Sequence, residues 1–289
     1  MVGAQAPDWV LNGEPEPPVL WAAVYLDEAD LAIAQLWHDT AEAALGPMVR
    51  PAGAPRMRRS HGGRHGVTVR RRSWADMMHP SLESAWATWG YGDERPHGPV
   101  EHVRLGAWRH DGPYLQLTLS AGLVDASAMP ALADAVVDVV RTVGDRADLG
   151  YGEIADRVRM GPSTDLDWAL RRSDEDSLRD SRRHLRGYGW VTVCPAAIAS
   201  ALGGAAVMRD SGAFTEVVEL APGGLLLRAT RTTFDYDDAA VRRVFEALRP
   251  VLPPGRPEQP AYETLPHLVI EDAVMEDAGL TVVPEPPPV

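Results

Sequence analysis

Two histidines, His61 and His65, stand four residues apart in the segment His-Gly-Gly-Arg-His, a spacing that suits two ligands of one metal ion. The spacing places both rings on one face only when the segment is helical. Two glycines between them disfavour a helix, and His61 is not followed by the glutamate that a zinc protease requires. We therefore interpret this segment as a basic loop and expect no metal site.

Arginine is the second residue type that could do chemistry, and it is concentrated in the same region. Between Arg50 and Arg72 there are eight arginines and no acidic residue, although the whole chain has a net charge of −13. Guanidinium groups bind carboxylates and phosphates through paired hydrogen bonds, and arginine and tryptophan are enriched in protein interfaces. We therefore expect a partner-binding surface made by Arg58, Arg59, Arg64, Arg70, Arg71, Arg72 and Trp74.

Two other interpretations of the arginines stay open at this point. Phosphate contacts, with Trp74 stacked on a base, would bind nucleic acid, but the acidity of the whole protein opposes the approach of a polyanion. The arginines could also pair within the chain, with the acidic segment Asp165–Asp180.

Catalytic signatures are absent from the sequence. The carboxylates of Asp165-Leu166-Asp167 and Asp174-Glu175-Asp176 have no histidine, serine or glycine-rich motif beside them, so we interpret them as a solvated face. Cys194 could be a nucleophile at a helix start, but a single cysteine in Val-Thr-Val-Cys is more typical of a core. Phosphate-loop, dinucleotide and nucleophile-elbow motifs are missing. We expect no catalytic residue and no cofactor.

Composition is that of a soluble globular protein, with 45% hydrophobic and 24% charged residues in 289. No basic-then-apolar opening predicts a signal peptide, and no apolar run approaches the roughly 18 residues that span a bilayer. One cysteine excludes a disulfide framework. We expect a cytoplasmic protein that does not contact membranes.

The clearest structural pattern lies in the second half of the chain. A strand at 188–193 leads through Cys194-Pro195 into a short helix that ends at Gly203-Gly204. Two β-rich runs, 214–220 and 225–230, flank a Pro/Gly turn and predict a hairpin. A helix opened by Asp237 and Asp238 follows, with one apolar face. The predicted core residues here are Trp190, Val191, Val193, Leu226, Val241 and Phe245.

The first half repeats this order of elements. A strand at 19–26 precedes a helix at 31–45, which Gly46-Pro47 should end. A hairpin at 103–121 and a helix at 129–143 follow, then a strand at 149–155. We predict a two-layer α+β fold from duplicated βαββα-like units, with antiparallel hairpins covered by helices. The expected segments are 1–18, loose; 19–156, first unit with an Arg-rich insertion at 47–100; 157–187, charged connector anchored by Trp168 and Leu170; 188–250, second unit; and 251–289, a Pro-rich acidic tail.

Several short motifs in 100–250 resemble one family. Leu185-Arg186-Gly187-Tyr188-Gly189-Trp190-Val191-Thr192 is similar to its Gly-x-x-Trp-(Leu/Val)-Thr strand, and Leu202-Gly203-Gly204 to its Leu-Gly-Gly. Its glycine-led last strand and its Gly-Tyr-x-Gly strand resemble Gly223–Ala229 and Leu149–Gly152. This is the type VI immunity-like family, also called the domain of unknown function 3396. Its Gly-Asp-rich segment has no counterpart at 232–237.

The resemblance implies a non-enzymatic cytoplasmic protein that binds and neutralises a cognate toxin effector. An alternative is an enzyme or accessory protein of bacterial secondary metabolism, with a pocket between the two units. The sequence does not identify the toxin, a substrate or the oligomeric state.

Overall fold

The computed structural model describes residues 18–49, 58–64, 67–71, 74, 83–90, 98–110, 113–156, 161–259, 265 and 267–270, with only the backbone of 58–64 and 67–71. The strands are β1 (Val19–Leu26), β2 (Arg58–Arg64), β3 (Val67–Arg71), β4 (Ser84–Trp89), β5 (Val100–Arg109), β6 (Leu115–Leu123), β7 (Tyr151–Ala155), β8 (Val191–Cys194), β9 (Glu216–Glu219) and β10 (Leu225–Arg228). The helices are α2 (Leu31–Val49), η1 (Ala126–Ala128), α3 (Met129–Gly144), α4 (Asp165–Ala169), α5 (Asp174–Arg179), α6 (Ala196–Ala201), α7 (Gly204–Asp210), η2 (Thr233–Asp235), α8 (Asp238–Leu248) and η3 (Arg249–Val251).

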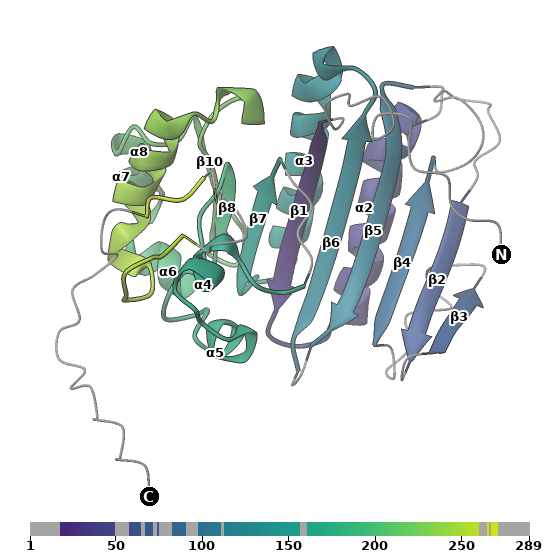
Figure 1. Ribbon diagram of the computed structural model, residues 1–289, viewed down its shortest axis with the longest axis horizontal. Coiled ribbons are helices and arrows are strands. Elements are labelled where there is room, and N and C mark those ends of the chain that lie inside the picture. Colours follow the sequence, from purple (N-terminus) through teal and green to yellow (C-terminus); the bar gives the residue numbers. More distant parts are fainter. Residues whose placement is uncertain are drawn as a thin grey trace, which may run out of the picture.

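All of the described strands belong to one sheet, in the order β3-β2-β4-β5-β6-β1-β7-β8-β10-β9 (Figure 1). Every neighbouring pair is antiparallel. In each half, the second strand of the hairpin pairs with the first strand of that half: β6 with β1, and β10 with β8. Strand β7 pairs with both β1 and β8 and so makes the sheet continuous.

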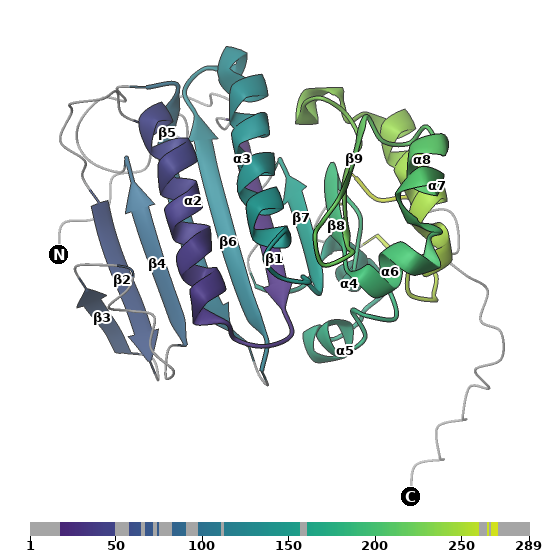
Figure 2. The same ribbon diagram turned by 180° about the vertical axis from the view of Figure 1, so that it is seen from behind.

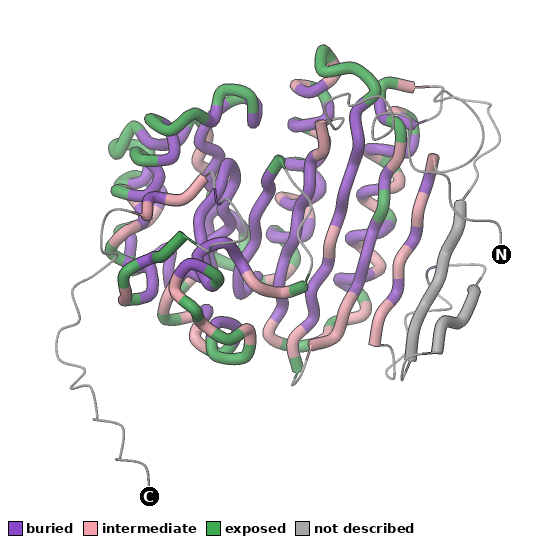
Figure 3. Tube along the Cα trace, in the orientation of Figure 1, coloured by how far each residue is buried: buried purple, intermediate pink, exposed green. Residues whose placement is uncertain are grey.

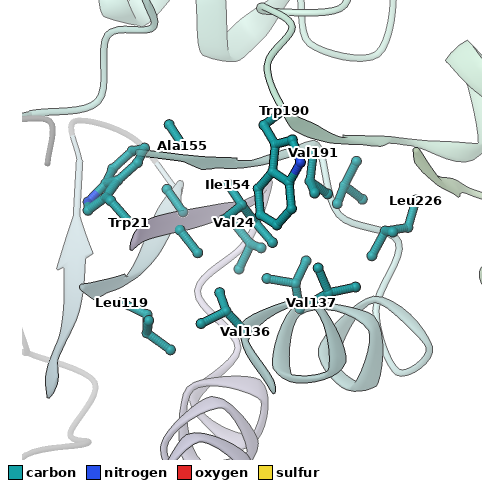
Figure 4. Close-up of a cluster of buried hydrophobic side chains, with 14 of the residues drawn as sticks. Trp21, Val24, Leu119, Val136, Val137, Ile154, Ala155, Trp190, Val191 and Leu226 are labelled. Atoms are coloured by element: carbon teal, nitrogen blue, oxygen red, sulfur yellow. The ribbon is translucent and has the colours of Figure 1, made fainter. Parts of the chain in front are cut away.

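The long helices α2 and α3 lie side by side across one face of the sheet (Figure 2). Helix α3 buries one apolar face, as its spacing of three and four residues predicts. Val136 and Val137 gather with Val24, Ile154 and Val191, which come from three adjacent strands (Figure 4). Burying each such side chain contributes about 1.5–3 kcal/mol, so this core joins the two halves.

One row of residues across neighbouring strands on this face shows why position 152 is a glycine. Val24, Gly152, Val193 and Leu226 lie opposite one another on β1, β7, β8 and β10. A Cβ on Gly152 would come within 2.9 Å of the Val193 Cβ and 3.3 Å of the Val24 Cγ1. The missing side chain therefore lets the valines of the two halves approach each other.

The segment 161–187 covers part of the opposite face. Val24 faces α3, so the alternation along β1 directs Tyr25 to the other side. The guanidinium of Arg186 lies 4.4 Å from the centre of the Tyr25 ring and 5.7 Å from that of Tyr151. This segment was expected to be a charged surface connector, but Arg186 and Asp167 within it are fully buried.

The two-layer α+β fold with antiparallel hairpins is confirmed, and all six predicted core residues are buried. The strand and helix order of the halves is also as predicted: β1-α2-β5-β6-α3 and β8-α6-α7-β9-β10-α8. In the second half, Gly203 takes the expected left-handed conformation, with φ of 83°.

Several local predictions were wrong. Helix α2 continues through Gly46-Pro47 to Val49, and the burial of Gly46 and Val49 keeps this last turn packed although Pro47 is exposed. The helical structure does not end at Gly203-Gly204: α6 has Pro195 as its N-cap, and a second helix, α7, follows directly after Gly203. The anchors of the connector are Leu166, Leu178 and Leu185; Trp168 is exposed and Leu170 only partly buried. The segment after 250 also begins inside the fold, since Val251 and Leu252 are buried.

Candidate functional site

Two arginine-rich strands form one end of the sheet. Strand β2 contains Arg58, Arg59 and Arg64, and β3 contains Arg70 and Arg71; Arg72 lies outside the described residues. The antiparallel register places His61 opposite Arg70 and Ser60 opposite Arg71. The fold thus brings together the two arginine runs that the sequence singled out. Strands β2 and β4 were not predicted from the sequence.

Trp74, the aromatic member of the predicted surface, lies elsewhere. It is 1% exposed, and its indole Nε1 donates a hydrogen bond to the Ala34 carbonyl of α2 at 3.2 Å. Its ring stacks on His38, with centroids 5.3 Å apart. Trp74 therefore packs between the sheet and α2, and does not belong to an exposed binding surface.

A different tryptophan pair lies on the opposite face of the sheet, beside β2. Trp86 of β4 stacks on Trp108 of β5, with ring centroids 5.8 Å apart and planes 14° apart. The register sets Trp86 opposite Gly106. A Cβ on Gly106 would come 2.6 Å from the Trp108 Nε1, so the glycine makes room for that indole on the sheet surface.

This face is uncovered by helices among the described residues. In Figure 1, α2 lies behind β5 and β6 and α3 lies behind β1, and no helix lies in front of β4, β5 or β6. Buried stretches alternate with partly or fully accessible ones along β4 and β5 (Figure 3). Trp86, Thr88 and Trp108 are partly exposed, and Arg104 is exposed. Arg104 is opposite Thr88, which in turn is opposite Arg59 of β2. We call Trp86, Thr88, Arg104 and Trp108, with strands β2 and β3, the aromatic–arginine surface.

This surface has the composition of a protein-binding site. Stacked indoles provide a large rigid contact area, and they gain from partial burial. Guanidinium groups beside them bind carboxylates and also interact with aromatic faces. Sequence reasoning missed Trp108 and Arg104 as site residues. The alternating Ser-Ala-Trp-Ala-Thr-Trp of β4 was the signal that could have indicated a two-sided strand with Trp86 on one face.

Acidic groups of the connector have partners near them in sequence. Asp176 pairs with Arg179, Asp180 with Arg172, and the buried Asp167 with Arg186. The interpretation of Asp167 as part of a solvated face was wrong. The Asp167 side chain is buried and forms a capping box with Thr164 at the start of α4. The connector packs on β1 and β7, and the nearer of these, β1, is four strand spacings from β2, about 19 Å. Pairing between connector and arginine strands is disfavoured by this separation.

The two other chemical candidates do not form a site in the described residues. His61 lies in β2 opposite Trp86 and His65 falls outside the described part; the described residues contain no cluster of three or more metal-ligating side chains. Cys194 is buried, and burial raises the pKa of its thiol far above the ordinary value. It is a core residue, as the sequence favoured.

A small cavity lies between the two halves. This is the position at which the alternative function, an enzyme or accessory protein of secondary metabolism, would require a substrate pocket. Its volume is about 10 Å³, room for about one water molecule. It is lined by Ala155, Asp156, Tyr188, Gly189, Trp190, Thr233, Tyr236 and His267. A cavity of this size is too small for an organic substrate, and it does not favour that alternative. Across the described part of the chain, none of the helices combines the length and hydropathy required of a bilayer-spanning segment.

Comparisons with known proteins show likeness in fold. No family model and no curated protein matches the chain. Among solved structures, the chain is similar to the T6SS protein PA0821 of Pseudomonas aeruginosa, with 12% sequence identity and a TM-score of 0.51. The match covers 83% of this chain and 75% of that chain. At this identity the likeness concerns the arrangement of strands and helices alone.

Proposed function

We propose that this protein is a non-enzymatic immunity-like protein, which binds and neutralises a toxin effector through the aromatic–arginine surface. The observation that carries the proposal is the stacked pair Trp86–Trp108, on a sheet face that no helix of the described residues covers, directly beside the two arginine-rich strands. The fold likeness to the T6SS protein PA0821 supports a role of this chain in the same kind of system.

The chemistry of the surface suits binding more than catalysis. Arginine stays protonated at all physiological pH values, and the indole of tryptophan is neither an acid nor a base in that range. Such side chains supply contact area and positive charge, which are the features of energetically dominant interface residues. The partner that fits them is an acidic protein surface.

The experiment is co-expression with toxin effectors encoded beside the gene in its native genome. The unmodified chain should restore growth, and the triple variant Arg70→Glu, Arg71→Glu, Arg72→Glu should not. A matched control, Arg146→Glu, Arg183→Glu, Arg243→Glu, makes the same change in net charge at three exposed arginines away from this surface and should still restore growth. The melting temperature of both variants should stay close to that of the unmodified protein.

Two results would contradict the proposal. A stably folded Arg70/Arg71/Arg72 variant that neutralises the effector as well as the unmodified chain would remove β3 from the binding surface. Failure of the unmodified chain to bind or neutralise any such effector would remove the immunity-like function. A large drop in melting temperature in the triple variant would instead identify the arginines as an internal clamp.

A further inference from the structure

We propose that the partner contributes an acidic, extended segment that adds as a further strand to the edge of β3 that has no neighbouring strand among the described residues. This inference rests on the proposed function and specifies how the partner binds. Strand addition uses main-chain hydrogen bonds for affinity and side-chain contacts for specificity.

The two edges of the sheet differ in their protection. At the β9 edge, Arg209 of α7 donates a hydrogen bond to the Val217 carbonyl at 3.4 Å and pairs with Glu219 at the same distance. A side chain and a helix thus lie against β9. Such covering is how proteins keep an edge strand from pairing with other chains.

The β3 edge has no such cover among the described residues. Strand β3 pairs with β2 on one side, and the sheet ends there. Alternate residues of an edge strand direct their N–H and C=O groups away from the sheet, so a strand of this length offers a short ladder to an incoming segment. Strand β2 is longer than β3 and pairs with all of its residues. Strand β3 is therefore held in place along its whole length when a further strand pairs with it.

Charge decides which occupant fits. Strands β2 and β3 together contain five arginines and no acidic residue: Arg58, Arg59, Arg64, Arg70 and Arg71. Opposite charges on neighbouring strands stabilise a pairing, and like charges destabilise it. A second copy of β3 would bring more arginines to the same edge, whereas an acidic segment would offset them. A nucleic acid could satisfy the charges, but it has no peptide groups to continue the ladder.

The probe is a synthetic peptide, acetyl-Glu-Val-Glu-Thr-Glu-Val-Glu-amide, titrated against the full chain. The control peptide has the same side chains and charge, with alternate backbone amides N-methylated so that they cannot donate hydrogen bonds. Because two or three ladder bonds are lost, the unmodified peptide should bind at least about tenfold more tightly. A ¹³C=O label in the bound peptide should give the infrared amide shift of a β-strand.

Proline in β3 locates the site on the protein. The amides of Thr68 and Val69 point to opposite sides of the strand, so Thr68→Pro and Val69→Pro each remove one. The variant that removes the outward amide should keep its melting temperature and lose peptide binding at least about tenfold. The variant that removes the amide facing β2 should lose a hydrogen bond between β3 and β2 and have a lower melting temperature.

Several outcomes would overturn strand addition. These are equal affinity for the two peptides, no peptide binding, unchanged affinity in both proline variants, displacement of the peptide by an oligothymidylate, or a dimer of this chain that depends on β3. Growth protection that still depends on Arg70, Arg71 and Arg72 would then leave the proposed function standing with a different binding mode. If the unmodified chain neither binds the peptide nor protects growth, the immunity-like function and the strand-addition mode are both rejected.

Discussion

The guanidinium of Arg186 is buried in a low-dielectric environment and is held by several contacts at once. Its Nε donates to the Ser177 hydroxyl at 2.9 Å, and its Nη2 donates to the Pro162 carbonyl at 2.7 Å and to Asp167 at 3.3 Å. Burial by itself disfavours the charged guanidinium, but the nearby Tyr25 phenol and Asp167 carboxylate, with Tyr151 and Glu153, together favour it more, and the pKa of Arg186 is raised. The contacts fix segment 161–187 on the rings of Tyr25 and Tyr151.

The first prediction follows from that burial. Arg186→Met should lower the free energy of unfolding by about 3–5 kcal/mol, because it leaves the Asp167 carboxylate buried without its main cation. Urea denaturation measures the change. Arg209→Met, which removes an exposed ion pair with Glu219, is the control and should cost at most about 1 kcal/mol. Equal effects in the two variants would show that Arg186 has no special structural role.

Trp190 gives the second prediction. It is 2% exposed, its Nε1 donates to the Thr230 carbonyl at 2.9 Å, and the Arg228 guanidinium lies 5.2 Å from its ring centre. Trp190→Ala should cost about 3–5 kcal/mol in a denaturant titration. Trp190→Phe keeps an aromatic ring and should cost less. An unchanged midpoint together with altered binding would instead make Trp190 a recognition residue.

The third prediction concerns Cys194 and pH. Burial raises the pKa of its thiol in the folded state, so the unfolded chain releases this proton first as pH increases. Ionisation above about pH 8.5 therefore stabilises the unfolded state, and the contribution of Cys194 to stability falls as pH rises. A thiol reagent at pH 8 should react with the denatured chain and scarcely with the folded one. Fast reaction of the folded protein would contradict a core position.

At the scale of elements, the alternation along β5 places Trp108 on the same face as Gly106, and the missing side chain of Gly106 leaves room for the indole. Gly106→Val should displace the indole, since a Cβ there meets the Thr118 Oγ1 at 2.4 Å and the Trp108 Nε1 at 2.6 Å. We expect loss of the near-ultraviolet circular dichroism of the stacked indoles and weaker partner binding. The same substitution in a Trp86→Leu background should change the spectrum much less. An unchanged spectrum in the single variant would show that the stack does not need the glycine.

Elements defined by local patterns were predictable from the sequence. Helices α3 and α8 have strong 3.6-residue periodicity, and β9 and β10 flank a turn whose Gly223 has φ of 97°. Strand β2 was not predictable, because Arg-Arg-Ser-His-Gly-Gly-Arg lacks β-propensity and is a strand through its pairing with β3 and β4.

The candidate site could be predicted only in part, for the same reason. The arginine cluster is visible in the sequence, but its position at a sheet edge depends on non-local pairing. Trp86 and Trp108 meet through the register of β4 with β5. Trp74 was assigned to the surface because it follows the arginines, whereas its contact with Ala34 brings together residues distant in the chain.

At the scale of the whole molecule, the two halves share one sheet and one core. Arg228 of β10 pairs with Asp134 of α3 at 2.8 Å, and Arg182 pairs with Asp27 at 2.7 Å. Strand β7 provides backbone pairing to both halves. These contacts indicate that neither half has a complete core of its own.

The fifth prediction tests this shared core. The full chain should unfold in one transition, with coincident midpoints by tryptophan fluorescence and far-ultraviolet circular dichroism. A fragment of residues 188–250 lacks β7 and α3, so it should show little protection of its amides from hydrogen exchange. A fragment with protection equal to that in the full chain would establish the second half as an independent domain.

The central position of β1 also has a consequence during synthesis on the ribosome. Strand β1 is made early, but Val24 pairs with Leu117 of β6, and Trp21 with Ala155 of β7. At the usual rates of translation, the wait between Trp21 and Ala155 is on the order of 10 s. The apolar segment Val-Leu-Trp-Ala-Ala-Val-Tyr-Leu has neither of its neighbours until β6 is made, and it still lacks one of them until β7 is made. The nascent chain should therefore be a substrate for ribosome-associated chaperones until β7 emerges from the exit tunnel.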